Sequence, residues 1–156
     1  MQLLPILAAA ALAGAALQSG AQEGQNPPLL VSLRVEERVA QPEAVLEMQN
    51  VSGKPVAAYA VRLIRRGEDG KALSIRTHSV ATRGVGLSLG RPSFLQGEKW
   101  KDTVALPEGQ PVEVHLDLVL FEDGTLWGPD KARQLERFQG LRDGARLERE
   151  AAKRQP

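Results

Sequence analysis

The feature that most constrains the fold is a period-two alternation of apolar and polar residues that recurs along the chain. It is clearest at Val112–Phe121, where apolar residues occupy every second position from Val112 to Leu120. The same alternation marks Leu29–Val35, Val45–Asn50, Val56–Arg65, Leu73–Thr77 and Trp100–Leu106. This period places alternate side chains on opposite faces of an extended chain, so each segment predicts a half-buried β-strand.

Turn-forming residues separate these strands and indicate hairpins. Asp69-Gly70 and Asp123-Gly124 are typical turns, in which aspartate caps local backbone and glycine adopts a positive φ. Trp100–Leu106 is the weakest strand, because Asp102 interrupts its apolar face. The fold predicted is mainly β, an antiparallel β-sandwich of about seven strands. Residues 80–93 contain three glycines and predict a long loop with one irregular edge strand.

The periodicity changes after Gly128 and becomes helical. Pro129 suits the first position of a helix, and an apolar stripe follows at the 3.6-residue spacing. That stripe consists of Leu135, Phe138, Leu141, Ala145 and Ala152. Gly140 and Gly144 predict a break or a frayed end in this helix. Residues 129–156 carry eight basic and five acidic side chains, whereas residues 22–128 carry 12 basic and 14 acidic ones.

The N-terminus has the composition of a signal peptide. Residues 1–21 contain no charged side chain, and Leu3–Leu17 form an apolar run shorter than the roughly 20 residues that cross a bilayer. Small residues at Ser19 and Ala21 suit cleavage after Ala21. We therefore expect an exported protein, periplasmic or secreted, with no transmembrane span in the mature chain. An uncleaved amphiphilic anchor is the alternative.

The predicted organisation is a signal peptide at 1–21, a linker at 22–28, the sandwich at 29–128 and a charged C-terminal helix or arm at 129–156. The chain has no cysteine, which excludes disulfides, cysteine–zinc sites and thiol catalysis. Its formal net charge of +1 argues against nucleic acid as a partner. No cofactor or metal is predicted. Glu113, His115 and Asp117 share one face of their predicted strand, which we interpret as a polar, solvent-facing surface.

The segment Leu46-Glu-Met-Gln-Asn-Val-Ser-Gly-Lys-Pro-Val56, followed by Ala58-Tyr-Ala-Val61, has an alternating strand that runs into an Asn-x-Ser corner. Phe121–Gly128 has the pattern of a closing hairpin. With these motifs the chain resembles small secreted bacterial Ig-like β-sandwich domain proteins over residues 29–128. The resemblance implies that Asn50 bonds local backbone at the corner. It implies no common chemistry for this group, only a binding or structural role.

Two sets of side chains are candidate binding residues. Leu135, Phe138 and Leu141 could anchor a protein partner through the C-terminal helix. The same stripe could instead pack on the sandwich, or the helix could lie on an anionic membrane surface. Trp100 and Trp127 are either core residues or an exposed platform for a sugar or peptide.

The sequence shows no catalytic constellation, so we expect a protein that is not an enzyme. The leading hypothesis is an exported envelope protein that acts as a protein-interaction or structural module, with an unknown protein partner in the cell envelope. The alternative is a carbohydrate- or small-ligand-binding β-sandwich module. A hydrolase built on a sandwich is the third hypothesis.

Overall fold

A computed structural model of the chain describes residues 26–36, 43–87, 90–106 and 112–154. The predicted signal peptide and its cleavage site lie outside these residues. The described strands are β1 (Leu29–Glu36), β2 (Glu43–Asn50), β3 (Val56–Arg66), β4 (Ala72–Ala81), β5 (Lys99–Ala105), β6 (Val112–Phe121) and β7 (Leu126–Trp127). A 3₁₀ turn, η1 (Arg83–Val85), follows β4, and one helix, α1 (Leu135–Lys153), ends the described chain. All six strands predicted from alternation are present.

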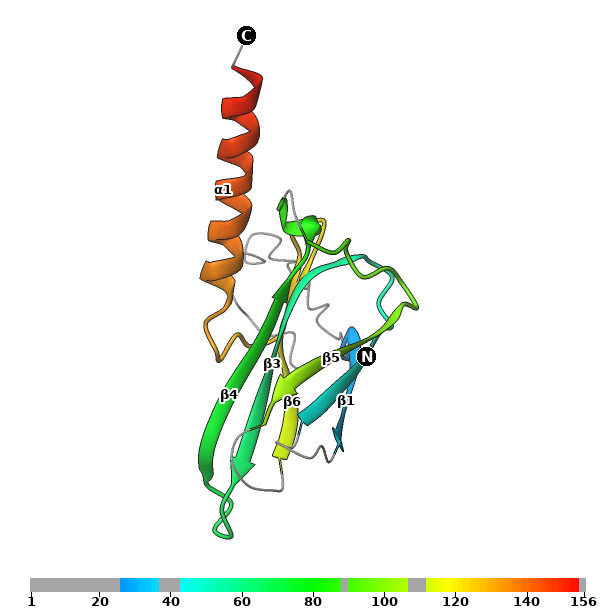
Figure 1. Ribbon diagram of the computed structural model, residues 1–156, viewed down its shortest axis with the longest axis vertical. Helices are drawn as coiled ribbons and strands as arrows, with labels where there is room; N and C mark the ends of the chain where they lie inside the picture. The colour runs from blue at the N-terminus through cyan, green and yellow to red at the C-terminus, as the bar shows by residue number, and fades with distance from the viewer. Residues whose placement is uncertain (1–25, 37–42, 88–89, 107–111, 155–156) are drawn as a thin grey trace, which may run out of the picture.

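The strands form two antiparallel sheets, which confirms the mainly β prediction. One sheet has three strands in the order β1-β2-β5, and the other has four in the order β4-β3-β6-β7. Figure 1 shows the smaller sheet, labelled at β1 and β5, beside the long strands β3 and β4 of the larger sheet, with β5 passing in front of β6. Strand β4 is an edge of the larger sheet and β5 is an edge of the smaller one.

One apolar cluster contains side chains from both sheets. Leu46 and Met48 of β2 belong to it together with Tyr59, Val61 and Leu63 of β3, as the alternation predicts. Its other buried members are Leu29, Ala44, Val56, Phe94, Trp100, Val104, Val119 and Phe121. Because this cluster joins the two sheets, its burial is the main source of hydrophobic stabilisation for the β part of the molecule.

A second apolar cluster lies where α1 covers the opposite face of the four-stranded sheet. The sheet and its following turn contribute Ala57, Ala58, Ala60, Val85, Leu118 and Leu120, and the helix contributes Phe138. Small alanines on β3 leave room for the phenyl ring of Phe138, which is 0% exposed. In Figure 1, α1 lies alongside one end of the sheet and continues beyond it. None of the described helices is long and apolar enough to cross a membrane.

A bulge at Asp117 changes the predicted pattern of β6. Ala60 pairs with Leu118 and Val61 pairs with Leu116, so Asp117 is an extra residue without a partner on β3. The alternation predicts that apolar positions from Val112 to Leu120 all face one way, and this is wrong. Val112, Val114 and Leu116 pack on the cluster between the sheets, whereas Leu118 and Leu120 face α1.

Asp117 also anchors the connection that leads to α1. Its side chain is 1% exposed, and its carboxylate accepts hydrogen bonds from the backbone N–H of Lys131 at 3.0 Å and of Ala132 at 2.8 Å. Its carbonyl accepts a bond from the N–H of Asp130 at 3.1 Å. The prediction of a polar surface shared with Glu113 and His115 is therefore wrong for Asp117.

The helix begins later than the sequence predicts and runs without interruption. Asp130 has a φ of 50°, which is incompatible with an α-helix starting at Pro129. The Asp130 carboxylate instead accepts a bond from the N–H of Gln134 at 2.6 Å, and α1 begins at Leu135. The predicted break at Gly140 and Gly144 is absent, since α1 is continuous through both.

The corner after β2 is held by Asn50, as the resemblance implies. Asn50 is 0% exposed, and its Nδ2 donates to the carbonyls of Lys54 and Phe94, each at 2.9 Å. Its Oδ1 accepts bonds from the N–H of Ser52 at 3.0 Å and from the Ser52 hydroxyl at 2.6 Å. A buried amide with donors and acceptor all used is a structural residue.

The described part of residues 80–93 differs from the predicted loop. Strand β4 continues to Ala81, and Thr82 caps η1 by accepting a bond from the N–H of Gly84 at 3.1 Å. Gly86 ends this turn with a φ of 98°. Residues 88–89 lie outside the described ranges. The extension of β4 matters for the site below, because it makes the edge of the larger sheet ten residues long.

Candidate functional site

The two tryptophans occupy different environments. Trp100 is 7% exposed and stacks on Phe94 with 3.7 Å between ring centroids, as expected for a core residue. Trp127 packs partly buried against the same cluster, and it also lines an open hollow of about 610 Å³. Phe121, Pro27 and Pro28 line that hollow with it. Both indoles border a space, since Trp127 lines this hollow and Trp100, although mostly buried, lines the groove on the three-stranded sheet described below.

The apolar stripe of α1 contacts the protein's own sheet. Phe138 is fully buried, and Leu135 and Leu141 pack partly buried around it. These side chains would have to leave the sheet before they could anchor a partner. In the docked helix they are structural, whereas Leu147, further along α1, is 61% exposed.

A polar cluster that the sequence reasoning missed joins the two sheets at their neighbouring edges. The Tyr59 hydroxyl of β3 donates to the Asp102 carboxylate of β5, and His78 Nε2 of β4 lies 3.4 Å from Asp102 Oδ2. The Trp100 indole N–H donates to the Tyr59 hydroxyl at 3.4 Å. The one signal in the sequence was Asp102 itself, an acid in an otherwise apolar strand face.

The electrostatics of this cluster favour a structural role. Burial, reinforced by the hydrogen bond to Asp102, raises the pKa of Tyr59 far above its ordinary value of 10.0. Burial also raises the pKa of Asp102, but hydrogen bonds from His78 and Tyr59 outweigh it and hold the pKa below 3.8. Tyr59 therefore keeps its proton and Asp102 keeps its charge. A nucleophilic phenolate would need the opposite shift.

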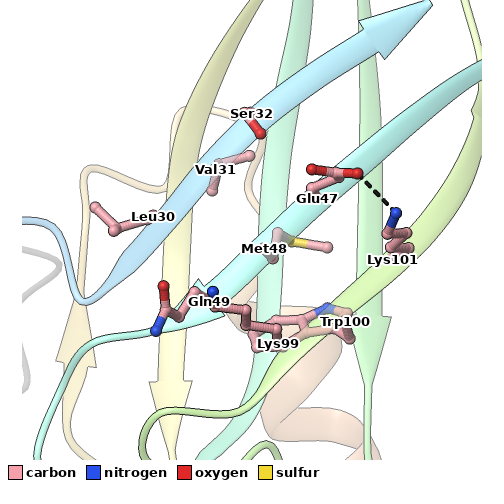
Figure 2. A pocket seen from close by; sticks show the side chains of 9 residues that line it. All are labelled: Leu30, Val31, Ser32, Glu47, Met48, Gln49, Lys99, Trp100 and Lys101. Carbon is pink, nitrogen blue, oxygen red and sulfur yellow. Dashed lines mark ion pairs between the residues drawn. The ribbon is translucent and has the colours of Figure 1, made fainter.

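The outer face of the three-stranded sheet carries a shallow groove of about 360 Å³ (Figure 2). Glu47 of β2 lies between cations of the neighbouring strands, 2.8 Å from Lys101 Nζ and 3.7 Å from Arg34. The hydrogen bond and charge of Lys101 lower the pKa of Glu47. These pairs connect all three strands of the sheet, so the Glu47 carboxylate is neutralised by cations of the fold itself.

A different surface follows the edge strand β4. Leu73 and Ile75 are 57% and 49% exposed, although both are large apolar side chains. Ile75 pairs with Ile64 and Thr77 pairs with Arg62, so Ile75 and Thr77 share the outer face of the sheet. Leu73 is an extra residue at a bulge, because Ser74 pairs with Arg65 and Ala72 pairs with Arg66. Arg76 is exposed on the opposite face of the same edge. We call Arg62, Leu73, Ile75, Arg76 and Thr77 the β4 surface.

The β4 surface lies away from the helix. Figure 1 shows the β3–β4 hairpin extending in the direction opposite to α1. Helix α1 reaches β4 near its other end, where the Arg137 guanidinium donates to the Ser79 hydroxyl. Sequence reasoning identified Leu73–Thr77 as a strand but could not tell that it forms an edge, because strand order depends on contacts between distant segments.

Comparison with known proteins does not assign this chain to a family. No family model and no curated protein matches this chain. Among solved structures, the chain is similar to a hypothetical protein from Peptoclostridium difficile 630, with 13% sequence identity and a TM-score of 0.46. The similarity covers 74% of this chain and 93% of that chain. Function must therefore be inferred from the chain's own residues.

Proposed function

We propose that this chain is an exported, non-enzymatic envelope protein, an Ig-like β-sandwich that acts as a protein-interaction module. Two antiparallel sheets with a common apolar cluster support the sandwich. The uncharged, apolar leader supports export. The polar clusters described above support a role without catalysis, because their groups are used in contacts within the fold.

The observation that carries the proposal is the exposed apolar edge of β4. Soluble proteins protect sheet edges with charges, prolines, bulges or short strands, because unpaired backbone groups invite another strand. Strand β7 has two residues, and β5 carries Lys99, Lys101 and Asp102 among its seven. Strand β4 has ten residues and one bulge, at Leu73 near the hairpin end. From Ser74 to Ala81 it pairs regularly with β3, and apart from His78 its one ionisable side chain is Arg76. A partner that covers β4 would bury Leu73 and Ile75.

Photo-crosslinking in the native host tests this function. A photoreactive amino acid at position 73 should give one discrete protein adduct in the envelope fraction, whereas the same probe at Gln49 should not. The double change Leu73→Ser and Ile75→Ser should abolish the adduct obtained with a probe at position 77 and leave the thermal midpoint nearly unchanged. Identical adducts from positions 73 and 49 would refute the edge as the interaction surface.

A carbohydrate- or small-ligand-binding module is the second candidate. The hollow beside Trp127 supports it, since an aromatic ring there is combined with the polar side chains of Ser52, Lys54 and Thr125. A sugar that binds in the hollow should shift Trp127 fluorescence, and the shift should be lost in Trp127→Phe. Unchanged emission across a panel of neutral oligosaccharides would remove this candidate.

A further inference from the structure

We propose that the β4 surface binds an acidic, extended polypeptide segment, which adds to the four-stranded sheet as a further strand beside β4. This inference rests on the proposed interaction function and names the chemistry of the partner. Among the described strands, β3 is the neighbour of β4 on one side, and none pairs with its other side. The backbone groups of that free side can accept an added strand.

The two faces of β4 determine the pattern of the added strand. On the outer face, Ile75 presents apolar surface beside its buried partner Ile64 on β3, and the exposed Leu73 follows at the bulge. On the opposite face, Arg76 is the exposed group. Side chains of a strand alternate between faces, so along the regular part of β4 the partner should place an apolar residue beside Ile75 and acids beside Arg76.

The local charge favours an acidic partner. Between Arg62 and His78 the chain has five basic residues and two acidic ones, although residues 22–128 together carry an acidic excess. Among the described residues, neither Arg62 nor Arg76 has an acidic partner within ion-pair distance. A negatively charged segment would supply these missing counter-charges.

The same positive charge disfavours pairing of β4 with the β4 strand of a second copy of this chain. Antiparallel pairing of two β4 strands about Arg76 would place the two Arg76 side chains directly opposite each other, and like charges in that position are destabilising. It would also juxtapose two hairpins with a positive excess. Arg76 thus opposes self-association while it attracts an acidic strand.

Peptide binding by the purified mature chain tests the inference. The probe is a fluorescein-labelled peptide in which glutamate alternates with valine, read by fluorescence polarisation. Control peptides have lysine in place of glutamate, or the same glutamates and valines in two separate blocks. We expect the alternating acidic peptide to bind at least about tenfold more tightly than either control, and to weaken as salt rises.

Variants locate the binding on β4. Arg76→Glu should weaken binding of the acidic peptide by about tenfold and improve binding of the lysine peptide. The matched control is Lys99→Glu, an exposed lysine on the other sheet, which should change neither. Amide hydrogen exchange in residues 72–81 should slow when the acidic peptide binds, because an added strand bonds those amides.

Three outcomes would overturn the inference. These are equal binding of blocked and alternating peptides, binding without slower exchange in β4, and tighter binding of a single-stranded oligonucleotide than of the peptide. A dimer in sedimentation that Ile75→Lys dissolves would replace the acidic segment with a second copy. If position 73 still crosslinks to a protein in the host while the acidic peptide fails, the interaction function stands and the partner chemistry is wrong.

Discussion

At the scale of single residues, buried polar side chains hold together parts of the chain that are distant in sequence. Asp102 is the clearest example, because its carboxylate on β5 takes hydrogen bonds from β3 and β4 of the other sheet. Its side chain is 21% exposed, so these hydrogen bonds are partly shielded from solvent. An unpaired acid at this depth would destabilise the fold, whereas the paired one connects two sheet edges.

This arrangement predicts a pH-dependent stability. The pKa of Asp102 in the folded protein lies below its ordinary value of 3.8, so its contribution is present above that value and is lost as the pH falls through the folded pKa. Asp102→Asn should therefore cost about 1–3 kcal/mol at pH 7 and much less near pH 2. Urea unfolding from pH 7 to pH 2 measures this difference.

The exposed helical acid Glu150 provides the control for Asp102. Glu150→Gln should follow the wild-type stability across the same pH range, because its side chain lies in solvent. A stability difference between Asp102→Asn and wild type that stays constant from pH 7 to pH 2 would contradict a stabilising charge on Asp102.

At the scale of elements, the connection between β7 and α1 is the most constrained segment. Gly128 has a φ of 105°, and a Cβ at this position would lie 2.3 Å from the carbonyl oxygen of Asp117. The turn that follows is bonded to both the backbone and the carboxylate of Asp117. The glycines inside α1 are different, because nothing lies within 4 Å of a Cβ at Gly140 or Gly144.

Alanine at these glycines should therefore have opposite effects. Gly128→Ala should lower the free energy of unfolding by about 3 kcal/mol or more, because it combines backbone strain with a clash against Asp117. Gly140→Ala should raise it by up to about 1 kcal/mol, the difference in helix propensity. Chemical denaturation of the two variants measures both values, and effects of the same sign would show that the connection is built differently.

Alternation in the sequence predicts elements well and contacts between them poorly. The six strands follow from their own residues, because the period-two pattern is a local property. The bulge at Asp117 does not, since an extra residue in β6 is defined only by its pairing with β3. Likewise, the residues around Asp102 in the sequence do not explain an acid in an apolar strand face, because its partners Tyr59 and His78 lie on other strands. The position of β4 at the edge of its sheet cannot be predicted for the same reason, because it depends on which strands pair.

At the scale of the whole molecule, the four-stranded sheet is covered unequally on its two faces. One face shares its apolar cluster with the smaller sheet, and the other is covered by α1 near one end only. Phe138 fills the centre of that contact, and Ala145 continues it against the turn after β4. The residues of α1 after Ala145 are exposed.

The docked helix predicts a large difference between two of its apolar residues. Phe138→Ala should cost about 3–5 kcal/mol of unfolding free energy, because it leaves a cavity over β3 and β6. Leu147→Ala should stay within about 0.5 kcal/mol of wild type, since its side chain is 61% exposed. Thermal and urea unfolding of both variants provide the measurement. Similar small losses would mean that α1 does not rest on the sheet in solution.

The bulge at Asp117 also determines where this chain can change length. Before the bulge, Val114 and Leu116 pack in the cluster between the sheets, whereas after it Leu118 and Leu120 pack against α1. The alternation of β6 must therefore shift by one position between Leu116 and Leu118. Loss of that single residue would turn Leu118 and Leu120 toward the other sheet and Val119 and Phe121 toward the helix. Insertions and deletions should therefore accumulate in the loops and be excluded from the middle of β6.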